Sequence, residues 1–230
     1  MKVLVVGASG GSGRAALHEL LRRDHEVTAF SRHATALAAR LGTDRVRGID
    51  GDATNPSDVD RAVRGQDAVV VTLGISENPV MVRLRGPAST PADVRSRGTH
   101  IIIEAMRRYG VRRLVVQTSY GVGPTRAHLP VMQRLIFWLL LLPQIADTER
   151  QDQLVRSSGL DWINIQPVNL TDDAAAGLPF ASTTGEIRGT KVARARVGRV
   201  LAEAVEGRDY VGQTVSLSAS DARRAPVSTA

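Results

Sequence analysis

Short apolar runs alternate with longer helical patterns along the chain, and this alternation constrains the fold more than any other feature. Several runs are apolar at every position, which is typical of parallel strands that helices cover on both faces. The runs predict strands over residues 2–6, 26–30, 45–48, 68–72, 113–117, 162–166 and 214–217. The patterns between them predict helices over residues 12–23, 34–41, 56–64, 91–109, 147–157 and 191–206. Repeated βα units of this kind predict a doubly wound, parallel α/β sheet.

The chain is expected to form one domain. Its 230 residues permit one large domain or two small ones, but no linker and no repeat divides them. We assign residues 1–218 to this domain and residues 219–230 to a poorly ordered tail. Two segments interrupt the alternation: a loop containing Gly, Pro and Arg at 74–90, and a long insertion at 121–146.

Composition excludes several classes of function. The absence of cysteine excludes disulfide scaffolds, thiol catalysis and cysteine-based metal sites. The net charge of +7 invites a nucleic-acid partner, but the arginines are scattered and aromatic residues make up only 3% of the chain, too few for a base-stacking platform. We therefore expect no nucleic-acid binding. The histidines lack metal-ligand spacing, so no metal site is expected; they are His18, His25, His33, His100 and His128.

No membrane span is expected either. The longest apolar run, residues 135–142, is far shorter than the ~20 residues that cross a bilayer. No targeting segment precedes the first predicted strand, so the expected location is the cytoplasm.

The strongest local motif is a glycine-rich turn between the first predicted strand and the first predicted helix. Three glycines recur at intervals of three residues, which suits a tight turn, close approach of a pyrophosphate, and close packing of helix on strand. The helix N-terminus adds free N–H groups for the phosphates. The motif predicts a Rossmann-type dinucleotide site. Its candidate contacts are Gly7, Ala8, Ser9, Gly10, Gly11, Ser12, Gly13 and Arg14.

The end of the second predicted strand favours NADP(H) over NAD(H). A free ribose 2′-hydroxyl usually meets an acidic residue about 20 positions beyond the glycines, whereas a 2′-phosphate needs a cation. Here Ser31 and Arg32 occupy that place and no acid follows. Arg32 can pair with a phosphate, although a solvated loop charge is the alternative.

Two further turns lie where such a cofactor would pass. Asp52 and Ala53 follow the third predicted strand, where a carboxylate can accept a hydrogen bond from the adenine amino group. A helix cap or turn is an equally good explanation for Asp52. Leu73 and Gly74 end the fourth predicted strand, where glycine lets the backbone pass close to the cofactor.

Five motifs, at residues 5–14, 51–53, 65–74, 117–123 and 158–167, together carry a resemblance to a known group. Through them the sequence resembles the atypical short-chain dehydrogenase/reductase group, which includes biliverdin-IXβ/flavin reductases and NmrA-like redox-sensing regulators. The resemblance covers about residues 1–218 and implies an NAD(P)-binding Rossmann fold. It does not specify a substrate.

The resemblance also implies which residues face the nicotinamide. The conventional Tyr-x-x-x-Lys pair is missing, since Pro124 stands four residues after Tyr120. Flavin-reductase-like members carry Thr-Ser after the fifth strand, and Thr118 and Ser119 match it. Ser119 is thus a candidate catalytic residue, and Tyr120 a candidate donor or a packing residue.

Two later positions complete the comparison with the group. The backbone that closes over the nicotinamide corresponds to Pro167, Val168 and Asn169, and Gln166 replaces the arginine that many relatives have. The helix start at Asp147 also departs from the group's pattern, so its carboxylates are interpreted as caps.

Three functional hypotheses remain open at this point. The first is an NADPH-dependent reductase that transfers hydride to a flavin, quinone or similar conjugated small molecule. The second is a non-catalytic NADP(H) sensor that acts through a protein partner. The third, an epimerase-like or isoflavone-reductase-like enzyme, is disfavoured by the missing Tyr/Lys pair and the lack of a large substrate domain. The apolar segment 130–143 is expected to cover the substrate side or to form a homodimer or partner contact; a helix buried within its own domain and association with a membrane surface are the alternatives.

Overall fold

The computed structural model describes residues 1–74, 90–129, 131–174 and 176–219. The helices are α1 (Gly11–Arg22), α2 (Ala34–Leu41), α3 (Pro56–Val63), α5 (Val94–Tyr109), the 3-10 helix η1 (Gly123–His128), α6 (Val131–Arg156) and α7 (Arg194–Glu206). The strands of the main sheet are β1 (Lys2–Val6), β2 (Glu26–Ser31), β3 (Val46–Asp50), β4 (Ala68–Val71), β5 (Arg113–Gln117), β6 (Asp161–Pro167), β8 (Phe180–Ser182) and β10 (Gln213–Ser218). A second, small sheet contains β7 (Asn169–Thr171) and β9 (Lys191–Ala193).

The main sheet confirms the predicted Rossmann-type topology. Its strand order is β3-β2-β1-β4-β5-β6-β10-β8, and the strands from β3 to β10 pair in parallel. Only the pairing of β8 with β10 in this sheet is antiparallel. Successive strands are added on one side of β1 up to β3 and on its other side from β4 onward. Folds of this type place their ligands at this change of direction, between β1 and β4.

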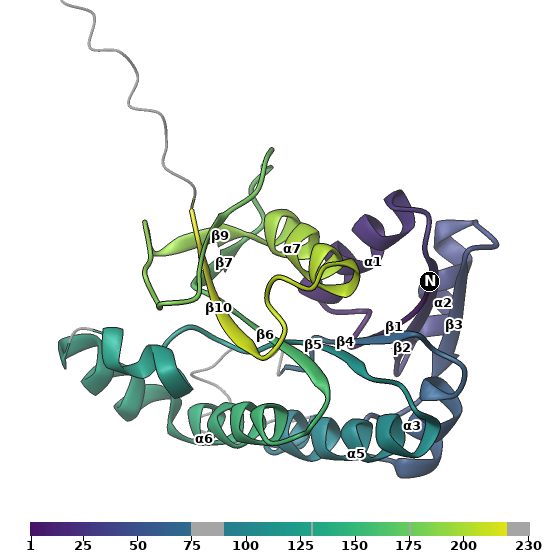
Figure 1. Ribbon diagram of the computed structural model, residues 1–230, viewed down its shortest axis with the longest axis horizontal. Helices are drawn as coiled ribbons and strands as arrows, with labels where there is room; N and C mark the ends of the chain where they lie inside the picture. The colour runs from purple at the N-terminus through teal and green to yellow at the C-terminus, as the bar shows by residue number, and fades with distance from the viewer. Residues whose placement is uncertain (75–89, 130, 175, 220–230) are drawn as a thin grey trace, which may run out of the picture.

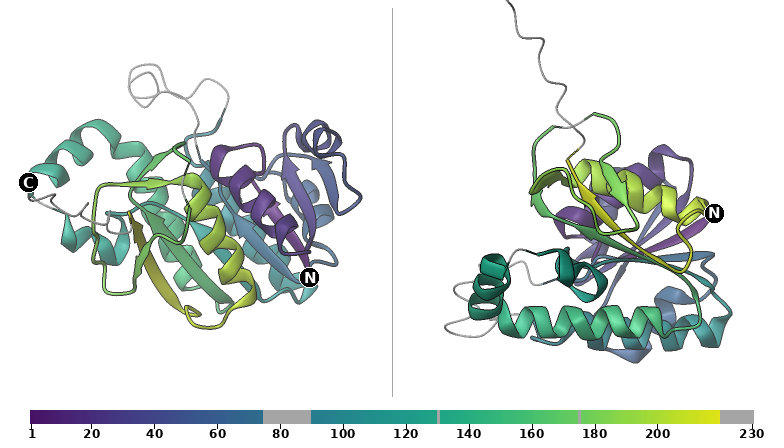
Figure 2. Two further views of the ribbon diagram at one scale, coloured as in Figure 1. Left: turned by 90° about the horizontal axis from the view of Figure 1, so that it is seen from above. Right: turned by 60° about the vertical axis from the view of Figure 1, so that its left-hand side comes forward.

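Helices cover both faces of the sheet (Figures 1 and 2). Helices α1, α2 and α7 pack on one face, and α3, α5 and α6 pack on the other. Strand β1 shows why its sequence is apolar throughout, because Val3 and Val5 enter one core cluster while Leu4 and Val6 enter the other. All four side chains are fully buried or nearly so. Each contributes roughly 1.5–3 kcal/mol of transfer free energy.

Helices α1 and α7 lie unusually close to each other, and a glycine permits it. A Cβ atom on Gly198 of α7 would lie 2.6 Å from the backbone carbonyl of Ala15 on α1. The side of the sheet that carries the glycine turn is therefore held directly against the last helix of the fold.

Local signals account for several element ends. Asn55 caps α3 by accepting a hydrogen bond from the backbone of Ser57, and Pro56 takes the first helical position. Gly110 ends α5 in the left-handed conformation, as expected for a helix C-terminus.

Two predictions about secondary structure were wrong. Residues 191–193, expected as the start of a helix, form strand β9, which pairs with β7 before α7 begins at Arg194. The helix expected over 147–157 is the second half of α6, which begins at Val131 and continues through Pro143. Proline removes one helical hydrogen bond, so the sequence predicts the end of a helix at Pro143, but α6 continues through this residue. The expected insertion at 121–146 thus contains η1 and the first part of α6.

Other predictions fall outside the described residues. Most of the loop at 74–90 and the tail beyond 219 lie there, as do Pro130 and the side chains of 131–143. The proposed role of segment 130–143 as a cover or contact stays a prediction. No helix among the described residues has the length and apolar character needed to cross a membrane.

Candidate functional site

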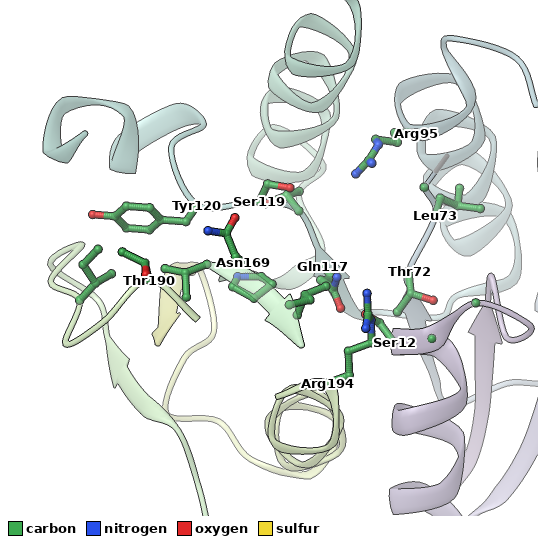
Figure 3. Close-up of a pocket in the computed structure, with 18 of the residues that line it drawn as sticks. Ser12, Thr72, Leu73, Arg95, Gln117, Ser119, Tyr120, Asn169, Thr190 and Arg194 are labelled. Carbon is green, nitrogen blue, oxygen red and sulfur yellow. The ribbon is translucent and has the colours of Figure 1, made fainter. Parts of the chain in front are cut away.

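A cavity of about 710 Å³ opens at the carboxyl edge of the sheet, beyond the paired ends of β1 and β4. This volume is typical of small-molecule sites. Its walls come from the glycine turn, the ends of β4, β5 and β6, the start of α5, and the segment that leads into α7 (Figure 3). The cavity brings together these predicted site residues: Gly10, Gly11, Ser12, Leu73, Gly74, Thr118, Ser119, Tyr120, Pro167, Val168 and Asn169.

The glycine turn has the geometry that its spacing predicted. Gly7 adopts a positive φ of 81°, and its N–H donates to the carbonyl of Phe30 at the end of β2. A Cβ on Gly13 would lie 2.2 Å from the Gly7 carbonyl oxygen, so only glycine allows the helix to start this close to the strand. Ala8 is fully buried beneath the turn, whereas Ser9 and Arg14 are exposed.

The start of α1 fits a bound pyrophosphate. No side chain caps this helix end, so the N–H groups of its first turn are available to a ligand. Gly10, Gly11 and Ser12 line the cavity at this point. A Cβ on Gly10 would contact only the Gly7 carbonyl oxygen, at 3.3 Å, so the space above it is open toward the cavity.

Arg194 is a cation beside this turn that the sequence patterns did not single out. It lies at the start of α7, and a Cβ on Gly11 would come within 2.8 Å of its side chain. Its guanidinium also pairs with Asp172. The chain order separates Arg194 widely from Gly11, and only the packing of α7 on α1 brings the two together.

Ser31 and Arg32 follow β2 at the same edge of the sheet, outside the cavity. Arg32 is exposed in the turn between β2 and α2. The Ser31 hydroxyl accepts a weak hydrogen bond from the His33 N–H at 3.4 Å. The position of Arg32 is compatible with a contact to the ribose of a dinucleotide, and that contact stays a prediction.

Asp52 acts as a turn residue in the structure. Its Oδ1 accepts hydrogen bonds from the backbone N–H and the hydroxyl of Thr54, both at 2.8 Å. These bonds give Asp52 the turn role that was one of its two explanations, and adenine recognition through Oδ2 stays a prediction. Ala53 is buried against α5 and, like Asp52, lies outside the cavity lining.

Thr118, Ser119 and Tyr120 form the floor of the cavity after β5, but their hydroxyl groups differ in what they do. Thr118 donates to Asn164 at 2.8 Å and is buried. The Tyr120 hydroxyl donates to the carbonyl of Gly185 at 2.9 Å, and burial raises its pKa. Ser119 is half-buried and has no hydrogen-bond partner among the described residues. Ser119 is thus the hydroxyl left available to a ligand.

A buried polar chain supports this floor from behind. Asn164, which accepts from Thr118, in turn donates to Asp152 on α6 at 2.6 Å. Burial raises the pKa of Asp152, while Arg156 opposes that rise. These bonds fix the position of Thr118, which lines the cavity, whereas Asn164 and Asp152 lie outside the lining.

The strand end after β6 closes the cavity on the side of β10. The Pro167 carbonyl accepts from the Tyr120 N–H at 3.1 Å, and the Val168 N–H donates to Leu217 at 3.0 Å. Gln166 is fully buried, donates to the Val122 carbonyl and accepts from the Thr125 hydroxyl. Its amide therefore holds the backbone after β5 and lies outside the cavity lining.

Arg95 and Gln117 line the cavity and were also missed. Gln117 ends β5, and its Oε1 is buried without a hydrogen-bond donor, which suits an amide or hydroxyl group of a ligand. Arg95 points into the cavity from the first turn of α5 (Figure 3).

Asp147, whose carboxylate was predicted to cap a helix start, caps α5. Its carboxylate accepts hydrogen bonds from the backbone N–H groups of Arg95 and Ser96, at 3.1 Å each.

The comparisons with known proteins agree with this geometry. A family model described as NAD(P)H-binding matches residues 7–208, most of the chain. Among curated proteins, the chain is 34% identical over 128 residues to a 3-beta-hydroxysteroid dehydrogenase of Mycolicibacterium neoaurum, covering 53% of this chain and 32% of that protein. It is 31% identical over 128 residues to a 2-alkyl-3-oxoalkanoate reductase of Stenotrophomonas maltophilia, covering 56% and 36%. The chain spans about a third of the length of these two relatives.

Solved structures share the fold over nearly the whole chain. The anaerobillin reductase ChuY from Escherichia coli O157:H7 superposes with a TM-score of 0.77 at 24% identity, covering 98% of this chain and 100% of that one. A short-chain dehydrogenase/reductase from Veillonella parvula, solved in complex with NADP, gives a TM-score of 0.76 at 17% identity and covers 94% of each chain. These likenesses concern the fold.

Proposed function

Because the chain belongs to the NAD(P)H-binding family of atypical short-chain dehydrogenases/reductases, we propose that it is a reductase using NADPH to reduce a flavin, quinone or similar conjugated acceptor. One observation carries the proposal. One cavity is lined both by the uncapped start of α1 and by the apolar side chains of Leu129, Val168, Leu170 and Ile187, of which the first two belong to one core cluster and Leu170 packs against it. Such a space can hold a dinucleotide along the sheet edge and a flat apolar ring beside it.

The chain's own residues would position the reactants. The first turn of α1 would bind the pyrophosphate through backbone N–H groups, and Arg194 would add positive charge beside it. Gln117 and Ser119 offer an acceptor and a hydroxyl near the end of β5. A bound nicotinamide supplies a hydride, and a conjugated acceptor takes up this hydride and one proton. Such a reaction depends more on close, oriented stacking than on a strong acid.

The relatives support a redox reaction without naming the acceptor. Two of them carry dehydrogenase and reductase names, and a protein of the same fold is an anaerobillin reductase. The apolar side of the cavity is compatible with a flat conjugated acceptor.

One observation favours the second candidate, a cofactor sensor. The Tyr120 hydroxyl is bound to the Gly185 carbonyl, and Ser119 alone is a weak acid. A protein that binds NADP(H) and signals through its surface needs no proton donor.

Steady-state oxidation of NADPH, followed by its absorbance, separates the two candidates. The protein is mixed with NADPH and a panel containing FMN, riboflavin and menadione, with the Gly10→Val variant as control. Turnover above the control with at least one acceptor supports the reductase. Tight NADPH binding with no turnover on the whole panel contradicts it and favours the sensor.

A further inference from the structure

Arg95 is a cation in the cavity that the proposed cofactor contacts do not use. Its side chain extends from the first turn of α5 into the cavity, whereas Arg194 enters from α7, which covers the opposite face of the sheet (Figures 1 and 3). One guanidinium nitrogen lies 3.3 Å from the Cβ position of Gly74, so a side chain at residue 74 would crowd it. The two arginines of the cavity, Arg95 and Arg194, therefore stand on different walls.

Among the described residues, the guanidinium of Arg95 lacks the partners that an enclosed charge normally has. Its Nε is buried without a hydrogen-bond acceptor, and no ion pair to the side chain occurs within the described ranges 1–74, 90–129, 131–174 and 176–219. A buried charge without a partner is costly, so such groups are usually paired or bind ligands.

Asp147, whose charge acts on Arg95, does not supply the missing partner. Asp147 accepts hydrogen bonds from the backbone N–H groups of Arg95 and Ser96 and from the Ser96 hydroxyl. Both carboxylate oxygens are engaged in capping α5, and neither pairs with the guanidinium. Burial lowers the pKa of Arg95 and the charge of Asp147 opposes this, but an arginine stays protonated at any physiological pH.

We propose that Arg95 binds an anionic oxygen group, a carboxylate or a phosphate, on the acceptor that enters the apolar side of the cavity. This inference rests on the proposed function, because it concerns the molecule that receives the hydride. A guanidinium matches the geometry of such a group and forms charge-assisted hydrogen bonds with it. The phosphates of the dinucleotide are assigned to the other wall, where the uncapped start of α1 lies.

The test compares acceptors that differ in charge. FMN is paired with riboflavin for the phosphate arm, and 1,4-naphthoquinone-2-carboxylate with menadione for the carboxylate arm. The kcat/KM for each is measured with the unmodified protein, Arg95→Gln and Arg95→Lys. Arg97→Gln is the matched control, because Arg97 lies on the same helix and is exposed outside the cavity.

We expect Arg95→Gln to lower kcat/KM about ten- to hundredfold for the anionic member of at least one pair, mainly through KM. The neutral member and the affinity for NADPH should stay within about twofold, and Arg95→Lys should restore part of the loss. The arm that responds identifies the anionic group. An equal loss for anionic and neutral acceptors, no loss, or weakened NADPH binding overturns the proposal.

A binding measurement separates this inference from the proposed function. The fluorescence of FMN and riboflavin is titrated with the NADP⁺-loaded protein and with the loaded Arg95→Gln variant, whose folding is checked by thermal unfolding. If no acceptor is reduced but FMN binds and Arg95→Gln abolishes its advantage over riboflavin, the anion site stands and the reductase proposal fails. If FMN and riboflavin bind equally to the unmodified protein and the carboxylate arm shows no difference, the anion site fails.

Discussion

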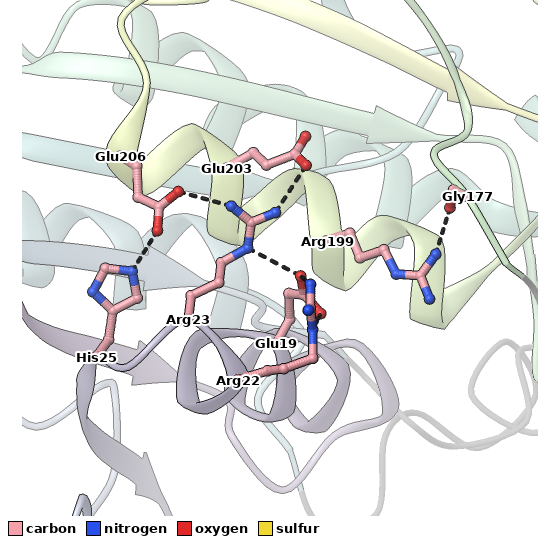
Figure 4. Close-up of polar contacts among 8 residues, drawn as sticks. All are labelled: Glu19, Arg22, Arg23, His25, Gly177, Arg199, Glu203 and Glu206. Atoms are coloured by element: carbon pink, nitrogen blue, oxygen red, sulfur yellow. Dashed lines mark hydrogen bonds and ion pairs between the residues drawn. The ribbon is translucent and has the colours of Figure 1, made fainter.

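The guanidinium of Arg23, just after α1, lies 2.8 Å from the carboxylate of Glu203 on α7 and so joins the two helices that flank the cofactor side of the sheet (Figure 4). The same guanidinium donates to Glu206 at 2.7 Å and to Glu19 at 3.0 Å. Only about a fifth of the Arg23 side chain is exposed.

Replacing Arg23 by Gln should destabilise the fold, because three carboxylates lose one shared cation. We expect a loss of about 2–3 kcal/mol in the free energy of unfolding, measured by urea denaturation. Arg45→Gln is the control: Arg45 pairs with Asp24 at the surface, so its loss should cost less than about 1 kcal/mol. Equal effects of the two substitutions would contradict the structural role of Arg23.

Glu19 should make stability fall in acid. The hydrogen bond from Arg22 brings the pKa of Glu19 down from 4.5 to about 2, against the effect of burial and with help from Arg23. A carboxylate whose pKa is lower in the folded state stabilises the fold above its unfolded pKa. That contribution is lost as the pH falls from about 4.5 through 2. The acid slope of the unfolding free energy should be shallower in Glu19→Gln, and an unchanged slope would contradict the assignment.

The glycine turn predicts two opposite kinds of variant. Gly10→Val should abolish NADPH binding with little loss of stability, because the added side chain enters the open space above the turn. Gly13→Ala should destabilise the fold by about 1–3 kcal/mol or more, because its methyl group overlaps the Gly7 carbonyl. Isothermal titration and thermal unfolding of both variants separate binding from folding. Unchanged binding in Gly10→Val would mean that the turn is only structural.

Arg32 should set the choice between the two nicotinamide cofactors. We expect NADPH to bind about ten- to hundredfold more tightly than NADH, since a charge-assisted bond to the 2′-phosphate contributes ~1.5–3 kcal/mol. Arg32→Glu should shrink or reverse this difference, whereas Arg40→Glu, at an exposed position on α2, should not. Equal affinities in the unmodified protein would refute the prediction.

Tyr120 and Ser119 should respond differently to removal of their hydroxyl groups. Tyr120→Phe removes the bond to the Gly185 carbonyl and should cost about 1 kcal/mol of stability with little change in kcat. Ser119→Ala should leave stability nearly unchanged and lower the rate of acceptor reduction. A large loss of kcat in Tyr120→Phe, with stability preserved, would instead make Tyr120 the catalytic donor.

The parallel sheet could be predicted from the sequence because its signals are local and repeated. Val3 to Val6 are buried on alternate sides, which forces every position of that run to be apolar. The glycine spacing was equally informative, because the backbones of Gly7 and Gly13, which are close in sequence, approach each other in the turn. In both cases the residues that constrain one another are close in sequence.

The rest of the site depends on contacts between distant segments. Strand β9 has three residues, too few for a periodic pattern, and it forms by pairing with β7. Arg194 and Arg95 carry no motif, and they reach the cavity only because α7 packs on α1 and α5 starts beside β4. Asp147 shows the same effect: a capping residue was expected, but which helix it caps is decided by the tertiary fold.

The order of the elements along the chain also determines when each part of the cavity becomes available during synthesis. The glycine turn leaves the ribosome with the first strand, whereas Ile187, Thr190 and Arg194, which line the same cavity, emerge only after the strands from β1 to β6. A nascent chain can therefore complete its phosphate-binding turn long before that part of the cavity exists. A dinucleotide that needs both parts cannot serve as a template for early folding. Its binding energy would be added only at the last step, when it stabilises the finished chain against unfolding.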